Sequence, residues 1–260
     1  MEVGAKIAVA GATGRVGSHL VEVLEARGHD VVAMARSRRV DVITGDGLAE
    51  ALTGVECVID VASGPSPDEA QATEFFTTAT RNLHEYGERA GVRRMVVVSI
   101  IGCDRFSGGY NVAKVAHERA MQSGPIPVRI LRAAQFHEFV AQLVDWGRRG
   151  EVSYVPKMRT QLVAARTVAE ALADLATNGR AVPVAGPSAA PIPEIAGPRE
   201  EDLVEIANLL ASRQGDPARV EVARDPADPD RDLFEKGGLL PGPHATLAGP
   251  AFEEWLGSTR

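Results

Sequence analysis

The feature that most constrains this chain is a run of three glycines, three residues apart, close to its N-terminus. Gly11, Gly14 and Gly17 follow the apolar run 7–10 and precede a segment with apolar residues at helical spacing. This order of strand, turn and helix presents backbone N–H groups at the positive end of a helix dipole, where phosphate binds. Gly11 permits the tight turn, Gly14 lets the backbone approach a pyrophosphate, and Gly17 lets the helix lie close to the strand. The pattern predicts a dinucleotide site; the alternative is an ordinary strand–helix turn.

A second apolar run, 31–35, ends in a short basic stretch. In folds of this kind the loop after the second strand meets the adenosine ribose, where an acidic residue binds the 2′-hydroxyl and a basic one suits a 2′-phosphate. Arg36, Arg38 and Arg39 stand there beside Ser37, with no carboxylate. The stretch favours NADP(H) as cofactor, with NAD kept as an alternative. A solvated basic loop is the other interpretation.

Two further loops are expected to complete this pocket. The run 40–44 predicts a short third strand, and Asp46 after it either N-caps the segment 49–52 or contacts the adenine. The apolar run 55–62 predicts a fourth strand. Ala62 and Ser63 then lie where the chain leaves the sheet edge at which such folds bind ligands. A plain turn is the alternative for this loop.

The strands alternate with helices of similar length through the first half of the chain. A long helix is predicted over 68–90, with its aromatic residues Phe75 and Phe76 in the core. Alternation of this kind predicts a parallel sheet with right-handed crossovers. The fold class we predict is α/β, a Rossmann-like doubly wound parallel sheet with a small C-terminal substrate-covering region. Residues 1–150 would form the NAD(P)-binding core, and 151–260 a smaller region packed on it in a single compact unit.

The residues that carry chemistry follow the next apolar strand, 94–98. Ser99 stands at its end, and Tyr110 and Lys114 open the following helix. Residues four apart on a helix share a face, with Cβ atoms about 5–6 Å apart. Because a nearby ammonium stabilises tyrosinate, Lys114 is expected to lower the pKa of Tyr110, which could then donate or accept a proton near neutral pH. Ser99 would bind a substrate oxygen. The alternatives are a surface Tyr–Lys pair, or one that binds only the nicotinamide ribose.

Several stretches of the chain together carry a family resemblance. They are the turn Gly11-Ala12-Thr13-Gly14-Arg15-Val16-Gly17, Ser99, Tyr110-Asn111-Val112-Ala113-Lys114, and Ile130-Leu131-Arg132-Ala133-Ala134-Gln135-Phe136-His137-Glu138-Phe139. They resemble the short-chain dehydrogenase/reductase superfamily, and within it the atypical NmrA-like, NAD(P)H-binding branch. The resemblance covers about residues 5–260 and is strongest through residue 140. It implies a Rossmann-like sheet, bound NAD(P)H, and a small C-terminal region over the substrate.

The expected site follows from these motifs and from the resemblance. Tyr110, Lys114 and Ser99 are the candidate catalytic residues, and no metal ligands are expected. His137 stands where the pocket should open and, with Phe136, is a candidate to touch substrate, although a lone histidine is more often structural. Where relatives often carry an aspartate before the helix at Val168, this chain has Arg166. The residues expected to contact the cofactor are Gly11, Thr13, Gly14, Arg15, Val16, Arg36, Arg38, Asp46, Ala62, Ser63, Lys114 and Gln135.

The second half of the chain changes in character, because 11 of its 16 prolines follow residue 180. Thr167 is expected to cap a helix that runs to about residue 177. The stretch 215–250, rich in proline, glycine and aspartate, predicts an ordered but irregular lid-like segment. The other elements expected here are strands at 160–164 and 182–187 and helices at 136–149, 200–212 and 252–256.

Charge and composition narrow the expected partners. The net charge of −7 argues against a general nucleic-acid-binding surface. No stretch approaches 18 uncharged apolar residues, so no membrane span is expected, and Met1 to Lys6 leaves no room for a signal peptide. Cys57 and Cys103 form neither a metal-ligand spacing nor a disulfide framework. We expect a cytoplasmic protein, a monomer or homodimer, that acts on a small molecule.

Three functions fit these features. The leading hypothesis is an NADPH-dependent oxidoreductase that reduces a carbonyl, or a related C=N or activated C=C bond, of a small organic substrate, with Tyr110 as proton donor. The second is an NADP(H)-binding redox sensor or regulator without turnover. The third is a non-redox epimerase, isomerase or cyclase on the same scaffold. Tyr110 and Lys114 favour an enzyme over a sensor, but they do not separate a reductase from an isomerase.

Overall fold

The computed structural model describes residues 4–177, 191–223 and 229–258. Contacts divide the chain into two compact units whose segments interleave along the sequence. The first comprises Met1–Ser99, Gly109–Leu131 and Val168–Pro193; the second comprises Ile100–Gly108, Arg132–Thr167 and Glu194–Arg260. This division differs from the single break near residue 150 that the sequence suggests, because the chain returns to the first unit after Thr167.

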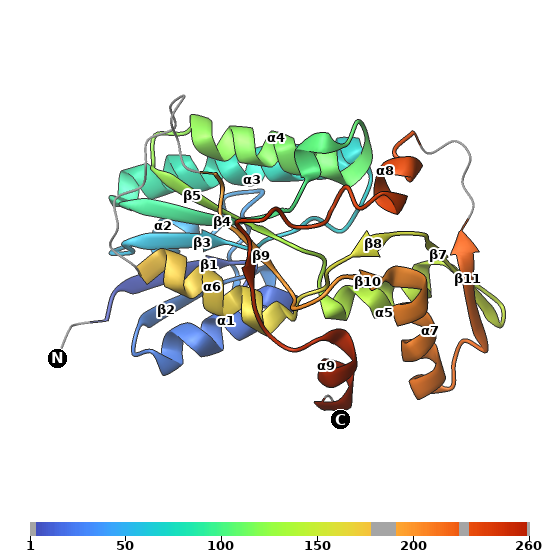
Figure 1. The fold of residues 1–260 in the computed structure, drawn as a ribbon. Coiled ribbons are helices and arrows are strands. Elements are labelled where there is room, and N and C mark those ends of the chain that lie inside the picture. The colour runs from blue at the N-terminus through green and yellow to red at the C-terminus, as the bar shows by residue number, and fades with distance from the viewer. Residues whose placement is uncertain (1–3, 178–190, 224–228, 259–260) are drawn as a thin grey trace. The chain divides into compact units, whose positions relative to one another are not determined.

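A parallel β-sheet forms the centre of the first unit (Figure 1). Strand β1 pairs in parallel with β2 and β3, and β3 pairs in parallel with β4. In the second unit the last residues of β5 pair with β9, and β9 pairs with β12, both in parallel. The sheet order β12-β9-β5-β4-β3-β1-β2 confirms the predicted Rossmann-like α/β class. The strands are β1 (Lys6–Ala10), β2 (Asp30–Met34), β3 (Cys57–Asp60), β4 (Arg94–Ile100), β5 (Val128–Ala133), β9 (Glu194–Ala196) and β12 (Thr246–Leu247).

Helices cover both faces of the strands in the first unit. Helices α3 and α4 lie side by side on one face, while α1 lies on the other (Figure 1). The strands β1, β3 and β4 are mostly apolar because both of their faces are buried; all four residues of β3 are buried. Residues of the sheet pack with α2, α3 and α4 in one core that includes Ala8, Val58, Leu83, Met95 and Met121. The helices are α1 (Arg15–Ala26), α2 (Leu48–Ala51), α3 (Glu69–Ala90), α4 (Gly109–Ser123) and α6 (Ala165–Thr177), of which α6 belongs to this unit from Val168 on.

The second unit has its own apolar core around α5 and α7. Val140 and Val144 of α5 pack with Ile206 and Leu210 of α7 and with Phe252. The stretch 215–250, expected to be irregular, contains β11, α8 and β12 among its described residues. The remaining elements are α5 (His137–Trp146), β6 (Arg148–Arg149), β7 (Val152–Pro156), β8 (Arg159–Thr160), β10 (Glu201–Asp202), α7 (Leu203–Gln214), β11 (Arg219–Ala223), α8 (Arg231–Glu235) and α9 (Phe252–Ser258).

Some local predictions are wrong. The run 40–44 forms a turn, not a strand, because Asp41 accepts hydrogen bonds from the backbone amides of Ile43 and Thr44. Asp46 caps nothing: the N-cap of α2 is Gly47, with no side-chain cap. Thr167 lies inside α6 instead of capping it. The strand predicted at 182–187 lies outside the described residues.

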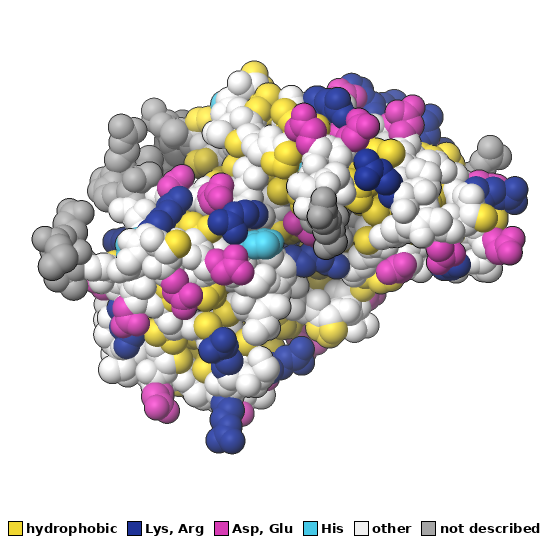
Figure 2. Space-filling view, turned by 90° about the horizontal axis from the view of Figure 1, so that it is seen from below, with side chains coloured by type: hydrophobic (Ala, Val, Ile, Leu, Met, Phe, Trp, Pro, Cys, Tyr) yellow, Lys and Arg dark blue, Asp and Glu magenta, His cyan; other side chains and the backbone are white. Residues whose placement is uncertain are grey.

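Charged and apolar side chains share the surface. On the face drawn in Figure 2, acidic and basic side chains are interspersed among apolar ones. Among residues 4–177, 191–223 and 229–258, no helix combines the length and the apolar character needed to cross a membrane.

Candidate functional site

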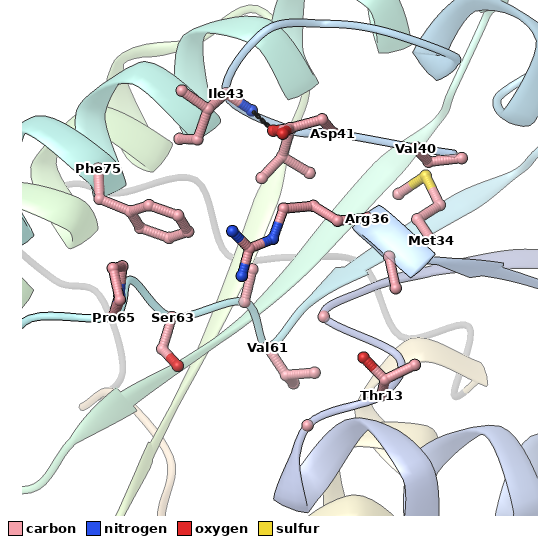
Figure 3. Close-up of a pocket in the computed structure, with 15 residues that line it drawn as sticks. Thr13, Met34, Arg36, Val40, Asp41, Ile43, Val61, Ser63, Pro65 and Phe75 are labelled. Carbon is pink, nitrogen blue, oxygen red and sulfur yellow. Dashed lines mark hydrogen bonds between the residues drawn. The ribbon is translucent and has the colours of Figure 1, made fainter. Parts of the chain in front are cut away.

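A pocket of about 400 Å³ opens in the first unit where β1, β2 and β3 end (Figure 3). This is the edge at which open parallel sheets bind ligands. Six of the expected cofactor residues line it: Gly11, Thr13, Gly14, Arg36, Ala62 and Ser63. The other lining residues are Met34, Ala35, Val40, Asp41, Val42, Ile43, Val61, Pro65 and Phe75.

The three glycines fit a dinucleotide, each for its own reason. Gly11 has a positive φ of 81°, and a Cβ there would lie 2.7 Å from the Cα of Ala62. A Cβ on Gly17 would lie 2.0 Å from the Gly11 carbonyl oxygen, so helix α1 packs directly on the turn. Gly14 is exposed, and a Cβ added there would lie 3.2 Å from its nearest neighbour, the Gly11 carbonyl oxygen. It is also the N-cap of α1 without a side-chain cap, which leaves its outer face open for a phosphate.

Arg36 is the basic residue that reaches this pocket. Its side chain extends across the cavity toward Phe75 and Ser63 (Figure 3). Arg38, in the same short 3-10 helix (Arg36–Arg38), does not line the pocket. Arg15 and Val16, in the first turn of α1, do not line it either, and Val16 is buried. The structure therefore singles out one arginine of the basic stretch.

Two pocket residues were missed at the sequence level. Phe75 was expected in the core, but adjacent residues on a helix face different directions, and Phe75 lines the pocket while Phe76 is 1% exposed. Asp41 lines it where Asp46 was expected; Asp46 is exposed and lies outside the lining. The sequence signal for Asp41 was its position directly before a short turn, where an aspartate side chain often binds backbone amides.

Tyr110 and Lys114 both lie on α4 of the first unit, and Ser99 lies in β4. Ser99 is 3% exposed and is followed by one more strand residue instead of ending the strand. The expected lowering of the pKa of Tyr110 is wrong, because other groups outweigh any effect of Lys114. Burial, with a smaller contribution from the charge of Asp60, raises the pKa of Tyr110 to about 12. The phenol is therefore protonated at neutral pH.

Lys114 is 5% exposed, and its ammonium points into the protein. It donates to the Val98 carbonyl oxygen at 2.8 Å and lies 2.9 Å from Nδ1 of His117. The other ring nitrogen of His117 lies 3.2 Å from the Asp60 carboxylate. Neither Asp60 nor His117 was a candidate at the sequence level. His117 stands one helical turn after Lys114, and that spacing was the only signal for it.

The expected nicotinamide and substrate residues lie in the second unit. Gln135 accepts a hydrogen bond from Thr160 Oγ1 at 3.0 Å, and Phe136 forms an isolated bridge with Val163. His137 is 1% exposed and donates from Nε2 to the Pro250 carbonyl oxygen. Burial lowers the pKa of His137. It therefore sits in the core of this unit.

Arg166 occupies the position where relatives often carry an aspartate. It is exposed in the first turn of α6. A carboxylate nonetheless lies at the N-terminus of this helix. The Ala165 amide donates to Glu138 Oε1 at 3.3 Å and to Oε2 at 3.1 Å. Acidic groups are favourable at a helix N-terminus.

Comparison with known sequences identifies the family. The model of the NAD(P)H-binding family matches residues 11–179. A sterol demethylase protein B of Methylococcus capsulatus is 38% identical over 36% of this chain and 34% of that protein. An L-arabinose 1-dehydrogenase (NAD(P)+) of Haloferax volcanii is 36% identical over 36% of this chain and 41% of that protein. The match thus spans well under half the length of these relatives.

Solved structures share the fold over almost the whole chain. MoeE5, in complex with UDP-glucuronic acid and NAD, is 20% identical and covers 92% of this chain and 95% of its own, with a TM-score of 0.64. A UDP-N-acetylglucosamine 4-epimerase from Bacillus cereus is 17% identical and covers 96% and 93%, with a TM-score of 0.66. At these identities the likeness establishes the fold. Taken with the family match and the glycine-walled pocket, it shows that this chain belongs to the NAD(P)H-binding family, in agreement with its resemblance to the NmrA-like branch of the short-chain dehydrogenase/reductase superfamily.

Proposed function

We propose that this chain is an NADPH-dependent oxidoreductase that reduces a carbonyl group, or a related C=N or activated C=C bond, of a small organic substrate. The observation that carries the proposal is the pocket lined by Gly11, Gly14 and Arg36, in the same unit as the half-buried phenol of Tyr110. A phenol that stays protonated can give a proton to an oxygen that becomes an alcohol. The bound nicotinamide would supply the hydride for this reduction.

The residues of the first unit have distinct roles in this proposal. Gly11 and Gly14 would hold the pyrophosphate with backbone N–H groups. Arg36 would pair with a 2′-phosphate on the adenosine ribose, and Ala62 and Ser63 would line the path of the cofactor. Tyr110 would donate the proton. Lys114 would support the helix turn that carries Tyr110, because its ammonium is bound inside the protein by the Val98 carbonyl oxygen and His117. Ser99 would orient the substrate oxygen.

Cofactor binding tests the role of Arg36. We expect NADPH to bind more tightly than NADH in a fluorescence titration. Arg36→Ala should weaken NADPH binding about tenfold or more, because a charge-assisted hydrogen bond contributes about 1.5–3 kcal/mol. NADH binding should change little. Arg38→Ala is the matched control, since Arg38 does not line the pocket. Tighter binding of NADH by the wild type would contradict the preference.

Turnover tests the role of Tyr110. Cofactor oxidation should be followed against aldoses, nucleotide sugars and simple carbonyl compounds, for the wild type and for Tyr110→Phe. The loss of a positioned proton donor should lower kcat by about 10²–10⁴-fold, with NADPH binding retained. If the wild type binds the cofactor but turns over no substrate, and Tyr110→Phe leaves cofactor binding unchanged, the proposal is overturned and a redox sensor is favoured.

A non-redox reaction is the second candidate, and one comparison favours it. An epimerase that acts on UDP-N-acetylglucosamine shares this fold. On this alternative, incubation with a nucleotide sugar would yield an isomer with no net change in NADPH. Product analysis by NMR beside the cofactor assay separates the two reactions.

A further inference from the structure

Three polar side chains form a buried row in the first unit. Asp60 ends β3, and Lys114 and His117 lie one turn apart on α4. Their exposed fractions are 2%, 5% and 1%. Lys114 Nζ is 2.9 Å from Nδ1 of His117, and His117 Nε2 is 3.2 Å from Oδ2 of Asp60. A buried ammonium and a buried carboxylate are thus joined through one imidazole.

The chemistry of the end groups sets the direction of these hydrogen bonds. An ammonium only donates, so Nδ1 of His117 accepts. The imidazole proton is then on Nε2, which donates to the Asp60 carboxylate. Burial is the main cause that lowers the pKa of His117, and Lys114 adds to it, while Asp60 and Glu118 oppose the shift. His117 is therefore a neutral ring with one defined tautomer.

Neighbours from β4, from α3 and from the loop after β3 hold the row in place. Lys114 Nζ also donates to the Val98 carbonyl oxygen of β4. The Phe76 ring of α3 stacks on His117 with centroids 4.4 Å apart and an interplanar angle of 12°, and it lies 4.4 Å from Lys114 Nζ. Asp60 Oδ1 accepts from the Ala62 amide, which belongs to the pocket wall. The ammonium is thus confined by partners on several sides.

Tyr110 touches the same assembly. Its ring packs edge-on against Phe76 with centroids 5.8 Å apart. Lys114 is directed toward His117 and β4, and the carboxylate of Asp60 raises the pKa of Tyr110. The row thus balances the lysine charge and favours the protonated phenol.

We infer that Asp60 and His117 are positioning residues for the reaction proposed above: His117 links the Lys114 ammonium to the Asp60 carboxylate and holds the ammonium against β4, beside the Phe76 ring on which Tyr110 packs. The inference rests on the proposed function for its catalytic consequence. The hydrogen-bonded row itself can be tested without turnover.

Nitrogen NMR of histidine-labelled protein tests the row directly. His117 should show a protonated Nε2 and an unprotonated Nδ1 throughout about pH 6 to 8, although a free histidine titrates in this range. His117→Gln identifies the signal by its loss. A His117 that titrates near its ordinary pKa, or carries its proton on Nδ1, overturns the inference whatever the enzyme does.

Turnover of the full chain tests the positioning role. In His117→Gln the amide oxygen can accept from Lys114 and the amide nitrogen can donate to Asp60, so the row persists without a titratable group. Gln should retain kcat within about tenfold, whereas His117→Leu should lower it about 100-fold, as misplacement of a reacting group does. His84→Gln replaces another buried histidine of this unit and should leave kcat unchanged.

The outcomes separate the two ideas. Equal losses in the Gln and Leu variants, or full activity in the Leu variant, overturn the positioning role. If the wild type turns over no substrate, the proposed function fails, and the NMR measurement still decides whether the row exists.

Discussion

At the residue scale, Gly14 and Gly17 face different surroundings although only three positions separate them. An added Cβ at Gly17 would meet the backbone of Gly11 and Ala12, which cannot move without opening the turn. At Gly14 it would approach only the Gly11 carbonyl oxygen, and a backbone φ of −79° suits any residue. Gly17 is thus required for the packing of α1 on the turn, whereas Gly14 leaves room for the ligand.

Alanine at each position should separate these roles. Gly17→Ala should lower the free energy of unfolding by about 1–3 kcal/mol, the usual cost of overpacking, as measured by urea denaturation. Gly14→Ala should cost less stability than Gly17→Ala, because its Cβ would lie 3.2 Å from the Gly11 carbonyl oxygen instead of 2.0 Å, and it should weaken NADPH binding, because Gly14 lines the pocket. Stability losses of equal size in both variants would contradict this assignment.

At the element scale, the long helix α3 has defined ends. The Asp68 carboxylate accepts from the Gln71 amide at 3.0 Å, and Gly91 ends the helix with a φ of 78°. The predicted range 68–90 differs from the observed helix by one residue, because Asp68 is the N-cap instead of the first helical residue. Asp46 is the counterexample: its position suits a cap, but Gly47 begins α2 without one.

The two aspartates therefore predict different mutational costs. Asp68→Ala should lower the free energy of unfolding by about 1 kcal/mol, because an amide of the first turn of α3 loses its partner. Asp46→Ala is the matched control, and its effect should fall within about 0.5 kcal/mol, as for an ordinary surface substitution. Urea denaturation of both variants at neutral pH is the measurement; a larger loss at Asp46 would refute the structural assignment.

At the scale of the whole molecule, the chain passes repeatedly between its two units. Helix α6 shows why residues 1–150 alone do not complete the first unit. Its residues Leu172 and Ala176 are fully buried, and two backbone carbonyls near its end accept from Arg94 and Arg129 at 2.9 and 2.7 Å. The first unit thus includes a helix that follows much of the second unit in the sequence.

Buried neutral histidines predict a pH dependence of stability. Burial is the main cause that lowers the pKa of His84, His117 and His137. The unfolded chain then binds more protons than the folded one below about pH 6.5. The histidine contribution to stability should be constant between about pH 7 and 8 and fall as the pH drops toward about 5.5, by at most about 1.4 kcal/mol per pH unit for each histidine.

Urea denaturation between about pH 5.5 and 8 measures this slope, in a window above the titration of most carboxyl groups. His84→Gln should make the slope shallower, because His84 Nδ1 accepts from the Ile126 amide and cannot do so when protonated. A stability that rises on acidification would contradict the prediction.

Sequence alone determined the parts of this protein that depend on neighbouring residues. The glycine turn and the alternation of strands and helices are short-range patterns, and they predicted the fold class and six of the residues that line the pocket. Tertiary structure decided the rest. Which arginine enters the pocket, how Asp60 and His117 meet Lys114, and whether Tyr110 is an acid or a base all depend on residues far apart in the chain. Burial sets these properties, because desolvation and long-range hydrogen bonds arise only when distant segments pack together.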